Sequence, residues 1–352
     1  NAGNSSSFGL MASGGITSCH LLPHFSNEAQ LSSHRRQVLD VLTALGNCRG
    51  LRNLSVNFAA LGAQLSRVLN KGTLTALTLD MDHFGPLQAL DDAELAAAFS
   101  GLHNCGRLQS LTIRHGAIAP AALNEHVLAR LAGNQSIQEL AIRSDLPLHG
   151  GEPHIGALAT SFELLNTCGG LRTFRLECPA AASPARVARE QLYALGKDSD
   201  HARASASVRL ASALRVSPLR RLFINGLVMH GATALGLACG LGGNASLEEL
   251  DLSGCGFPLN HAPQFIRNLE ANESIRLMAM PAPQSMIFHA ESDGSLCDLM
   301  QRGNTWDVDA CADSAKKDFE AFEGGGADYA QNFAYLACAK VAHRNAQLRS
   351  RR

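Results

Sequence analysis

The chain of 352 residues is long enough for one large domain or two ordinary ones, and hydrophobic residues make up 46% of it. Lys and Arg number 30 against 31 Asp and Glu, so the formal net charge of −1 gives no general attraction to nucleic acid or to an anionic membrane. No run of about 18 apolar residues occurs, so no membrane span is predicted. Aromatic residues are only 5%, and this aliphatic bias favours repeated thin layers over one thick core.

The chain begins with two segments that carry no repeat. Residues 1–16, with a Ser-rich start, are expected to be a flexible N-terminal segment, and residues 17–46 are expected to cap a repeat array. The pattern LxxLxL then recurs in eight copies, which start at Leu51, Leu74, Leu108, Ile137, Leu171, Leu219, Leu247 and Ile275. The alternation in each copy predicts a short strand whose apolar residues point inward and whose intervening residues point outward.

A helix is predicted before the copies of this pattern. Leu128 and Leu131, for example, have helical spacing and precede the polar break Asn134-Gln-Ser136, which ends the helix. Each unit is therefore strand, loop, helix and loop, and a unit of this size must stack on its neighbours to bury its apolar side. The predicted repeat region is 47–284, with about eight repeats.

Residues 37–280 resemble leucine-rich-repeat proteins, specifically the ribonuclease-inhibitor-like subclass with long repeats and a helix in every unit. The breaks at Asn134–Ile137 and Asn244–Leu247 are similar to those in secreted bacterial (type III) effectors and in eukaryotic innate-immune receptors, and the Ala content and Ser-rich start fit an effector better. The resemblance implies an α/β horseshoe with parallel strands on the concave face and helices on the convex face. It also implies protein recognition as the activity.

Two segments depart from this pattern. The copies at Leu171 and Leu219 are 48 residues apart, so an insertion is expected near residues 180–200. The last copy places the apolar Leu277 and Ala279 at outward positions, which predicts that residues 285–352 fold over it as a helical C-terminal cap.

The outward positions of the strands predict a binding surface. They form a central basic patch, an exposed aromatic residue and an acidic end, and Arg with aromatic residues is the composition of binding hot spots. We expect this surface to bind an acidic protein surface or a peptide; the alternative is that the charges only keep the sheet face solvated. The candidate partner-binding residues are Arg114, Glu139, Arg143, Arg175, Glu177, Arg221, Phe223, Glu249 and Asp251.

Catalytic and metal chemistry have weak support in the sequence. Cys48, Cys105 and Cys168 each lie three residues before a repeat copy, at a position where other repeats carry Asn, so we interpret them as a structural ladder. Cys311-Ala-Asp313 resembles the Cys-x-Asp nucleophile site of bacterial leucine-rich-repeat ubiquitin ligases, but the segment after the repeats is short for that catalytic domain. No metal-ligand or phosphate-loop motif is present, so no catalytic residue, metal or cofactor is predicted.

The sequence thus predicts a monomeric scaffold that binds a protein partner, and neither nucleic acid nor membrane. A secreted bacterial effector acting inside a host cell is the favoured class. Two alternatives stay open: an effector enzyme of the ubiquitin-ligase type with Cys311 as nucleophile, and the ligand-sensing repeats of an innate-immune receptor.

Overall fold

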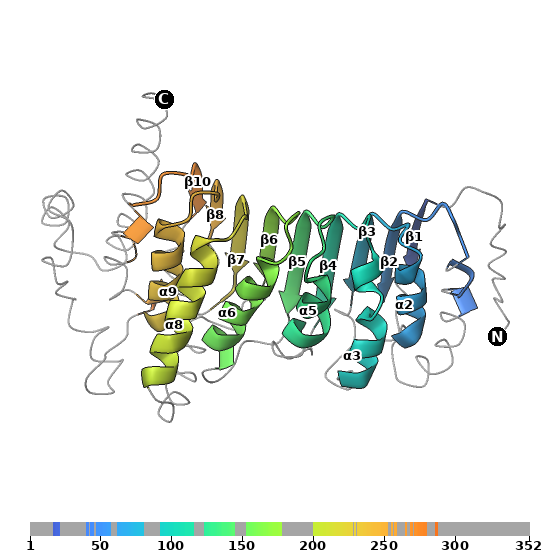
Figure 1. The fold of residues 1–352 in the computed structure, drawn as a ribbon, viewed down its shortest axis with the longest axis horizontal. Helices are drawn as coiled ribbons and strands as arrows, with labels where there is room; N and C mark the ends of the chain where they lie inside the picture. The colour runs from blue at the N-terminus through green and yellow to red at the C-terminus, as the bar shows by residue number, and fades with distance from the viewer. Residues whose placement is uncertain are drawn as a thin grey trace, which may run out of the picture.

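In a computed structural model of the chain, nine strands form one open parallel sheet, and the labelled helices lie along one face of it (Figure 1). The structure describes residues 17–21, 47–57, 62–80, 92–115, 123–144, 153–177, 200–227 and 231–252, with shorter stretches within 40–45, at 229 and within 255–287. The strands of the sheet are β1 (Ser18–Leu21), β2 (Asn53–Asn57), β3 (Ala76–Asp80), β4 (Ser110–His115), β5 (Glu139–Ser144), β6 (Thr173–Glu177), β7 (Arg221–Asn225), β8 (Glu249–Asp251) and β10 (Leu277–Ala279).

The helical layer consists of one helical segment in most repeats. Its members are α2 (Gly62–Asn70), α3 (Asp92–Phe99), the 3₁₀ helix η2 (Leu102–Asn104), the π-helix η3 (Asn124–Leu128), α5 (Ala129–Leu131), α6 (Pro153–Leu165), α8 (Asp200–Arg215) and α9 (Gly231–Gly242). A separate pair of short parallel strands, β9 (Phe257–Pro258) and β11 (Met286–Ile287), lies outside the main sheet.

Each predicted LxxLxL copy forms one strand, and neighbouring copies pair in parallel. The middle apolar residue of each copy is the register partner of the middle residue in the next, from Leu54 and Leu77 to Leu250 and Met278. From Leu54 to Leu250 these residues are at most 2% exposed, so they form a continuous apolar spine between sheet and helices. Burying one such side chain stabilises the fold by about 1.5–3 kcal/mol. The prediction of an α/β solenoid with one parallel strand per LxxLxL copy is therefore confirmed.

The first strand was not predicted. Residues Ser18–Leu21, within the segment expected to cap the array, pair in parallel with β2 and add a ninth strand to the sheet. The segment reads Ser-Cys-His-Leu and has only half of the apolar pattern, because Cys19 takes the position that Leu54 occupies in β2. A pattern based on leucine cannot detect such a strand.

One position recurs in the turns that precede the strands, and in five of the described turns its side chain bonds to the preceding repeat; we call it the ladder position. At the ladder position each main-chain N–H donates to the carbonyl three residues earlier, for example from Cys105 to Leu102 and from Asn244 to Leu241. The same main-chain bond defines eight ladder residues: Cys48, Gly72, Cys105, Asn134, Cys168, Ser217, Asn244 and Asn272. The thiols at Cys105 and Cys168 donate to carbonyls of the preceding repeat, at 3.2 Å to Leu69 and 3.1 Å to Leu131.

Asparagine makes more bonds at this position than cysteine does. The Asn244 amide donates to the carbonyls of Leu214 and Ser217, at 2.7 and 2.9 Å, and its Oδ1 accepts from the N–H groups of Ser246 and Leu247. Asn244 is 4% exposed, so these bonds replace water inside the turn. The structural interpretation of the ladder is confirmed for the cysteines with buried side chains, Cys105 and Cys168.

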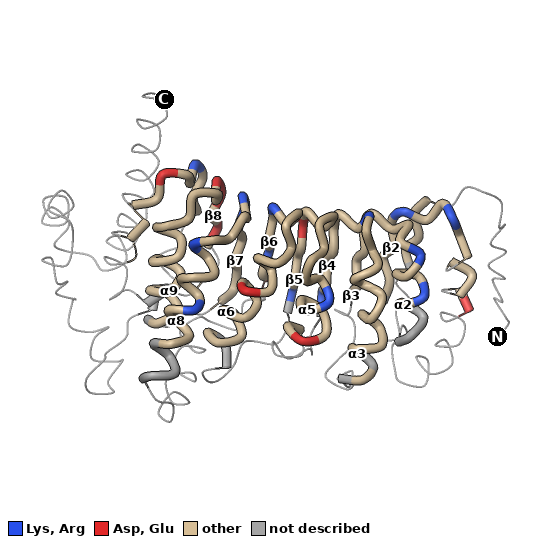
Figure 2. The backbone as a smooth tube through the Cα atoms, in the orientation of Figure 1, with Lys and Arg blue, Asp and Glu red and all other residues tan. Residues whose placement is uncertain are grey.

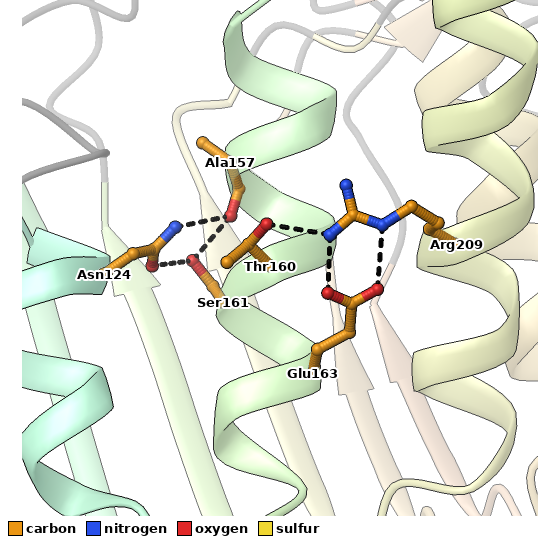
Figure 3. A network of polar contacts seen from close by, with 6 residues as sticks. All are labelled: Asn124, Ala157, Thr160, Ser161, Glu163 and Arg209. Atoms are coloured by element: carbon orange, nitrogen blue, oxygen red, sulfur yellow. Dashed lines mark hydrogen bonds and ion pairs between the residues drawn. The ribbon is translucent and has the colours of Figure 1, made fainter.

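The layers stay in contact across the long step between β6 and β7. Helix α8 packs beside α6, and the guanidinium of Arg209 binds both carboxylate oxygens of Glu163 and the hydroxyl of Thr160 (Figure 3). On the other side of α6, Ser161 donates to Asn124, whose amide donates to the carbonyl of Ala157. The helical layer is therefore joined across the site of the expected insertion, and β6 and β7 keep the common register.

Several sequence predictions lie outside the described residues. They are the flexible segment 1–16, the core of the expected insertion near 180–200 and, apart from β11, the C-terminal cap 285–352 with Cys311. The horseshoe curvature stays a prediction. In the part of the chain that the structure describes, no helix has the length and hydropathy needed to cross a membrane.

Candidate protein-binding site

Among the described residues, one face of the sheet carries no helix; we call it the helix-free face, and it lies opposite the labelled helices in Figure 1. Because successive residues of a strand point to opposite sides, the residues between the spine positions point to this face. The register aligns them in three rows across β4–β8. The rows are Ser110, Glu139, Thr173, Arg221 and Glu249; then Thr112, Ala141, Arg175, Phe223 and Asp251; then Arg114, Arg143, Glu177 and Asn225. All nine candidate binding residues lie in these rows.

Several row residues are less exposed than their outward positions led us to expect. Ser55 is 8% exposed and Thr173 is 9% exposed. Thr173 lies between the longer side chains of its register partners Glu139 and Arg221, which leave it little access to solvent. Phe223, expected to be exposed, is half-buried because the Arg175 side chain lies on its ring.

Five residues form a central cluster: Glu139, Arg175, Arg221, Phe223 and Glu249. The Arg175 Cζ lies 3.9 Å from the centroid of the Phe223 ring, directly across the β6–β7 pair. Its Nε lies 3.3 Å from Oε1 of Glu139, which is the diagonal neighbour on β5. On β7 and β8, Arg221 Nε lies 3.7 Å from Oε2 of its register partner Glu249. The central cluster therefore holds oriented guanidinium groups at a partly exposed surface.

The central surface is less basic than the sequence suggested. Arg175 and Arg221 are each paired with a glutamate of a neighbouring strand, so their charges are partly neutralised. Beside them, Arg114 and Arg143 are register partners with like charges, and Asp80 and Glu177 flank them as the next partners on either side. Opposite charges in register stabilise a sheet and like charges destabilise it. The face thus carries mixed charges rather than one basic patch.

The contacts of the central cluster contribute little to folding. A cation–π contact at an exposed site is worth about 0.5–1 kcal/mol, and an exposed ion pair about 0–1 kcal/mol. The side chains of Arg175 and Glu139 are 37% and 45% exposed, so solvent screens their pairing. A partner can consequently exchange these contacts for its own without disturbing the apolar spine beneath.

The thiols and metal-ligating side chains of the described residues have the following properties. The six cysteines among them, Cys19, Cys48, Cys105, Cys168, Cys239 and Cys255, carry free thiols. Burial raises the pKa of Cys105 to about 12 and also raises the pKa of Cys168, which opposes formation of a thiolate. No group of His, Cys, Asp and Glu within the described part could hold a metal ion.

A thiol titration with the folded chain checks this arrangement. We expect Cys239, which is exposed, to react rapidly with Ellman's reagent, and Cys105 and Cys168 to react only after unfolding. The raised pKa and the ladder hydrogen bonds both keep the latter thiols protonated and covered. Mass spectrometry of modified peptides identifies the sites, and rapid modification of Cys105 at neutral pH in the folded chain would contradict its ladder role.

The chain was compared with protein families, curated proteins and solved structures. No protein-family model matches the chain, and no curated protein matches it in sequence. Among solved structures, a crystal structure of a TLR13–ssRNA13 complex is similar with a TM-score of 0.31 and 14% identity, over 74% of this chain and 32% of that one. The chain therefore spans about a third of the length of that protein. The solenoid is established by the repeats and strand register of the chain itself.

Proposed function

We propose that the chain is a non-catalytic scaffold that binds a protein partner through the helix-free face of its sheet. The observation that carries this proposal is the central cluster, in which Arg175 is held between Phe223 and Glu139 while more than a third of its side chain stays exposed. An ordered guanidinium on an aromatic ring loses little conformational freedom on binding, and it offers directional donors to a carboxylate.

The partner in this proposal presents an acidic surface or peptide. Its carboxylates would replace Glu139 and Glu249 as acceptors for Arg175 and Arg221, and its apolar groups would cover Phe223. Because Arg175 and Arg221 already have acceptors, the favourable free energy of binding comes from excluding water around these arginines and not from long-range attraction. Partner binding is therefore expected to depend only moderately on salt.

Affinity capture with three matched chains tests the site. One is unchanged, one carries R143E, R175E and R221E on the helix-free face, and the control carries R67E, R130E and R276E at exposed positions on α2, on α5 and in the turn before β10. We expect the unchanged chain and the control to capture the same proteins. The amount of each captured protein should fall at least tenfold with the R143E, R175E and R221E variant. Circular dichroism verifies that both variants fold. Equal recovery by all three chains would contradict the proposed site.

We further propose that the partner is a host protein and that the chain is a secreted bacterial effector acting in the host cell. The support is the resemblance of the breaks at Asn134–Ile137 and Asn244–Leu247 to effector repeats, together with the high Ala content. A capture that returns specific host proteins at the helix-free face favours this class. Capture of bacterial proteins alone would contradict it.

A further inference from the structure

A second surface lies at the edge of the sheet where the strands begin. The turns between helix and strand all meet this edge, because every repeat runs in the same direction. In Figure 2, Lys and Arg recur along this edge. The first six turns, 47–52, 70–75, 102–109, 132–138, 166–172 and 215–220, contain seven Lys and Arg and no Asp or Glu. The seven are Arg49, Arg52, Lys71, Arg107, Arg172, Arg215 and Arg220, and we call them the basic edge.

The basic edge ends sharply. The next two turns, 243–248 and 271–276, carry Glu248 and Glu273 against Arg276 alone. The acidic side chain nearest the boundary pairs with the last cation of the basic edge, Arg220 to Glu248, at 3.8 Å. The overall charge of the chain is −1, but the turns before β2–β7 contain seven Lys and Arg and no Asp or Glu.

Helix dipoles explain part of this charge. The helices end at this edge, and the negative end of each helix favours nearby cations. Arg52 and Arg172 act in this way, since their guanidinium groups donate to turn carbonyls of Thr73, Gly169 and Leu171. Each helix end, however, carries only about half an elementary charge, so seven full charges exceed what a few helix ends need. Six of the seven residues are exposed, and Arg52 is half-buried.

We infer that the basic edge is a second docking surface, for an acidic segment of a protein. Parallel strands lie about 4.8 Å apart, so the turns present cations at intervals that an extended run of Asp and Glu can match. The six turns contain no Phe, Tyr or Trp, and single-stranded nucleic acid sites combine cations with aromatic residues that stack on bases. The composition therefore favours carboxylates over nucleotides. This inference does not depend on the helix-free face.

Binding of a fluorescent deca-glutamate peptide to the full chain tests the inference by anisotropy. We expect binding at low ionic strength that is lost in 0.5 M salt, a value about three times the physiological level at which exposed charges are already largely screened. The variant R107Q with R172Q should weaken the affinity by about fivefold, because two of seven interacting charges are removed. The control R67Q with R130Q makes the same change in net charge on helices α2 and α5, outside the six turns, and should leave the affinity within twofold.

Three results would overturn the inference. The first is no peptide binding by the unchanged chain at low salt. The second is equal weakening in both double variants, which would show that net charge alone attracts the peptide. The third is tighter binding of a uridine decamer than of the peptide under the same conditions, which would assign the basic edge to nucleic acid. The variant R143E with R175E and R221E should bind the peptide within threefold of the unchanged chain if the two surfaces are separate.

Discussion

Replacing Asn244 by Ala is expected to destabilise the chain by about 3–4 kcal/mol. The substitution removes four hydrogen bonds of the ladder and leaves two carbonyls and two N–H groups without this partner in a buried turn. Each typical bond contributes about 1 kcal/mol, and a buried group left unsatisfied costs about 1–3 kcal/mol. Urea unfolding followed by circular dichroism measures the change.

Two further variants make this result specific. Asn104→Ala removes an exposed amide that bonds only to Asn70 across the surface, and we expect a loss below about 1 kcal/mol. The loss of stability in Asn244→Cys should lie between those of Asn244→Ala and Asn104→Ala. At the same ladder position, the thiols of Cys105 and Cys168 each donate to one carbonyl of the preceding repeat. Equal stabilities of the Asn244→Ala and Asn104→Ala variants would refute the ladder as a stabilising feature.

The second large effect concerns the contact between α8 and α9. A Cβ built at Gly240 would lie 2.6 Å from Cβ of Leu214 and 2.9 Å from the carbonyl oxygen of Ala211, closer than such atoms approach in proteins. Gly240→Ala therefore requires the two helices to move apart, and we expect a loss of about 2–3 kcal/mol in the free energy of unfolding. Thermal unfolding of the purified variant measures it.

Gly156 in α6 provides the control of opposite sign. It is also helical, but a Cβ built there meets no atom within 4 Å. Gly156→Ala should therefore raise the free energy of unfolding by about 0.5–1 kcal/mol, since alanine loses less backbone entropy than glycine. If both substitutions stabilise the chain, the close approach of α8 and α9 is absent in solution.

The sequence allowed the fold to be predicted because the repeat reports both the strand and its register. Aligning the copies pairs Leu77 with Leu111 and Leu111 with Leu140, and the structure has the same pairs. The same alignment could not reveal β1, where cysteine and histidine take the place of the usual apolar and small residues. It also could not give the exposure of Thr173, which depends on the conformations of the long side chains beside it.

The candidate site was predicted in position but not in its contacts. The register makes Arg175 and Phe223 partners, so their contact follows from the aligned repeats. The pairing of Arg175 with Glu139 runs diagonally between strands, and side-chain torsions decide between it and other acceptors. The outward strand positions of the repeat do not include the basic edge, because its residues lie in turns of unequal length.

The contact of α8 with α6 has a consequence for how this chain tolerates change in length. Strands β6 and β7 are direct neighbours in the common register even though 43 residues separate the end of one from the start of the other. A connection of 43 residues is therefore compatible with the same register that the shorter connections give. For a protein engineer who wishes to graft a peptide or a reporter into this solenoid, we expect added length in that connection to shift no strand.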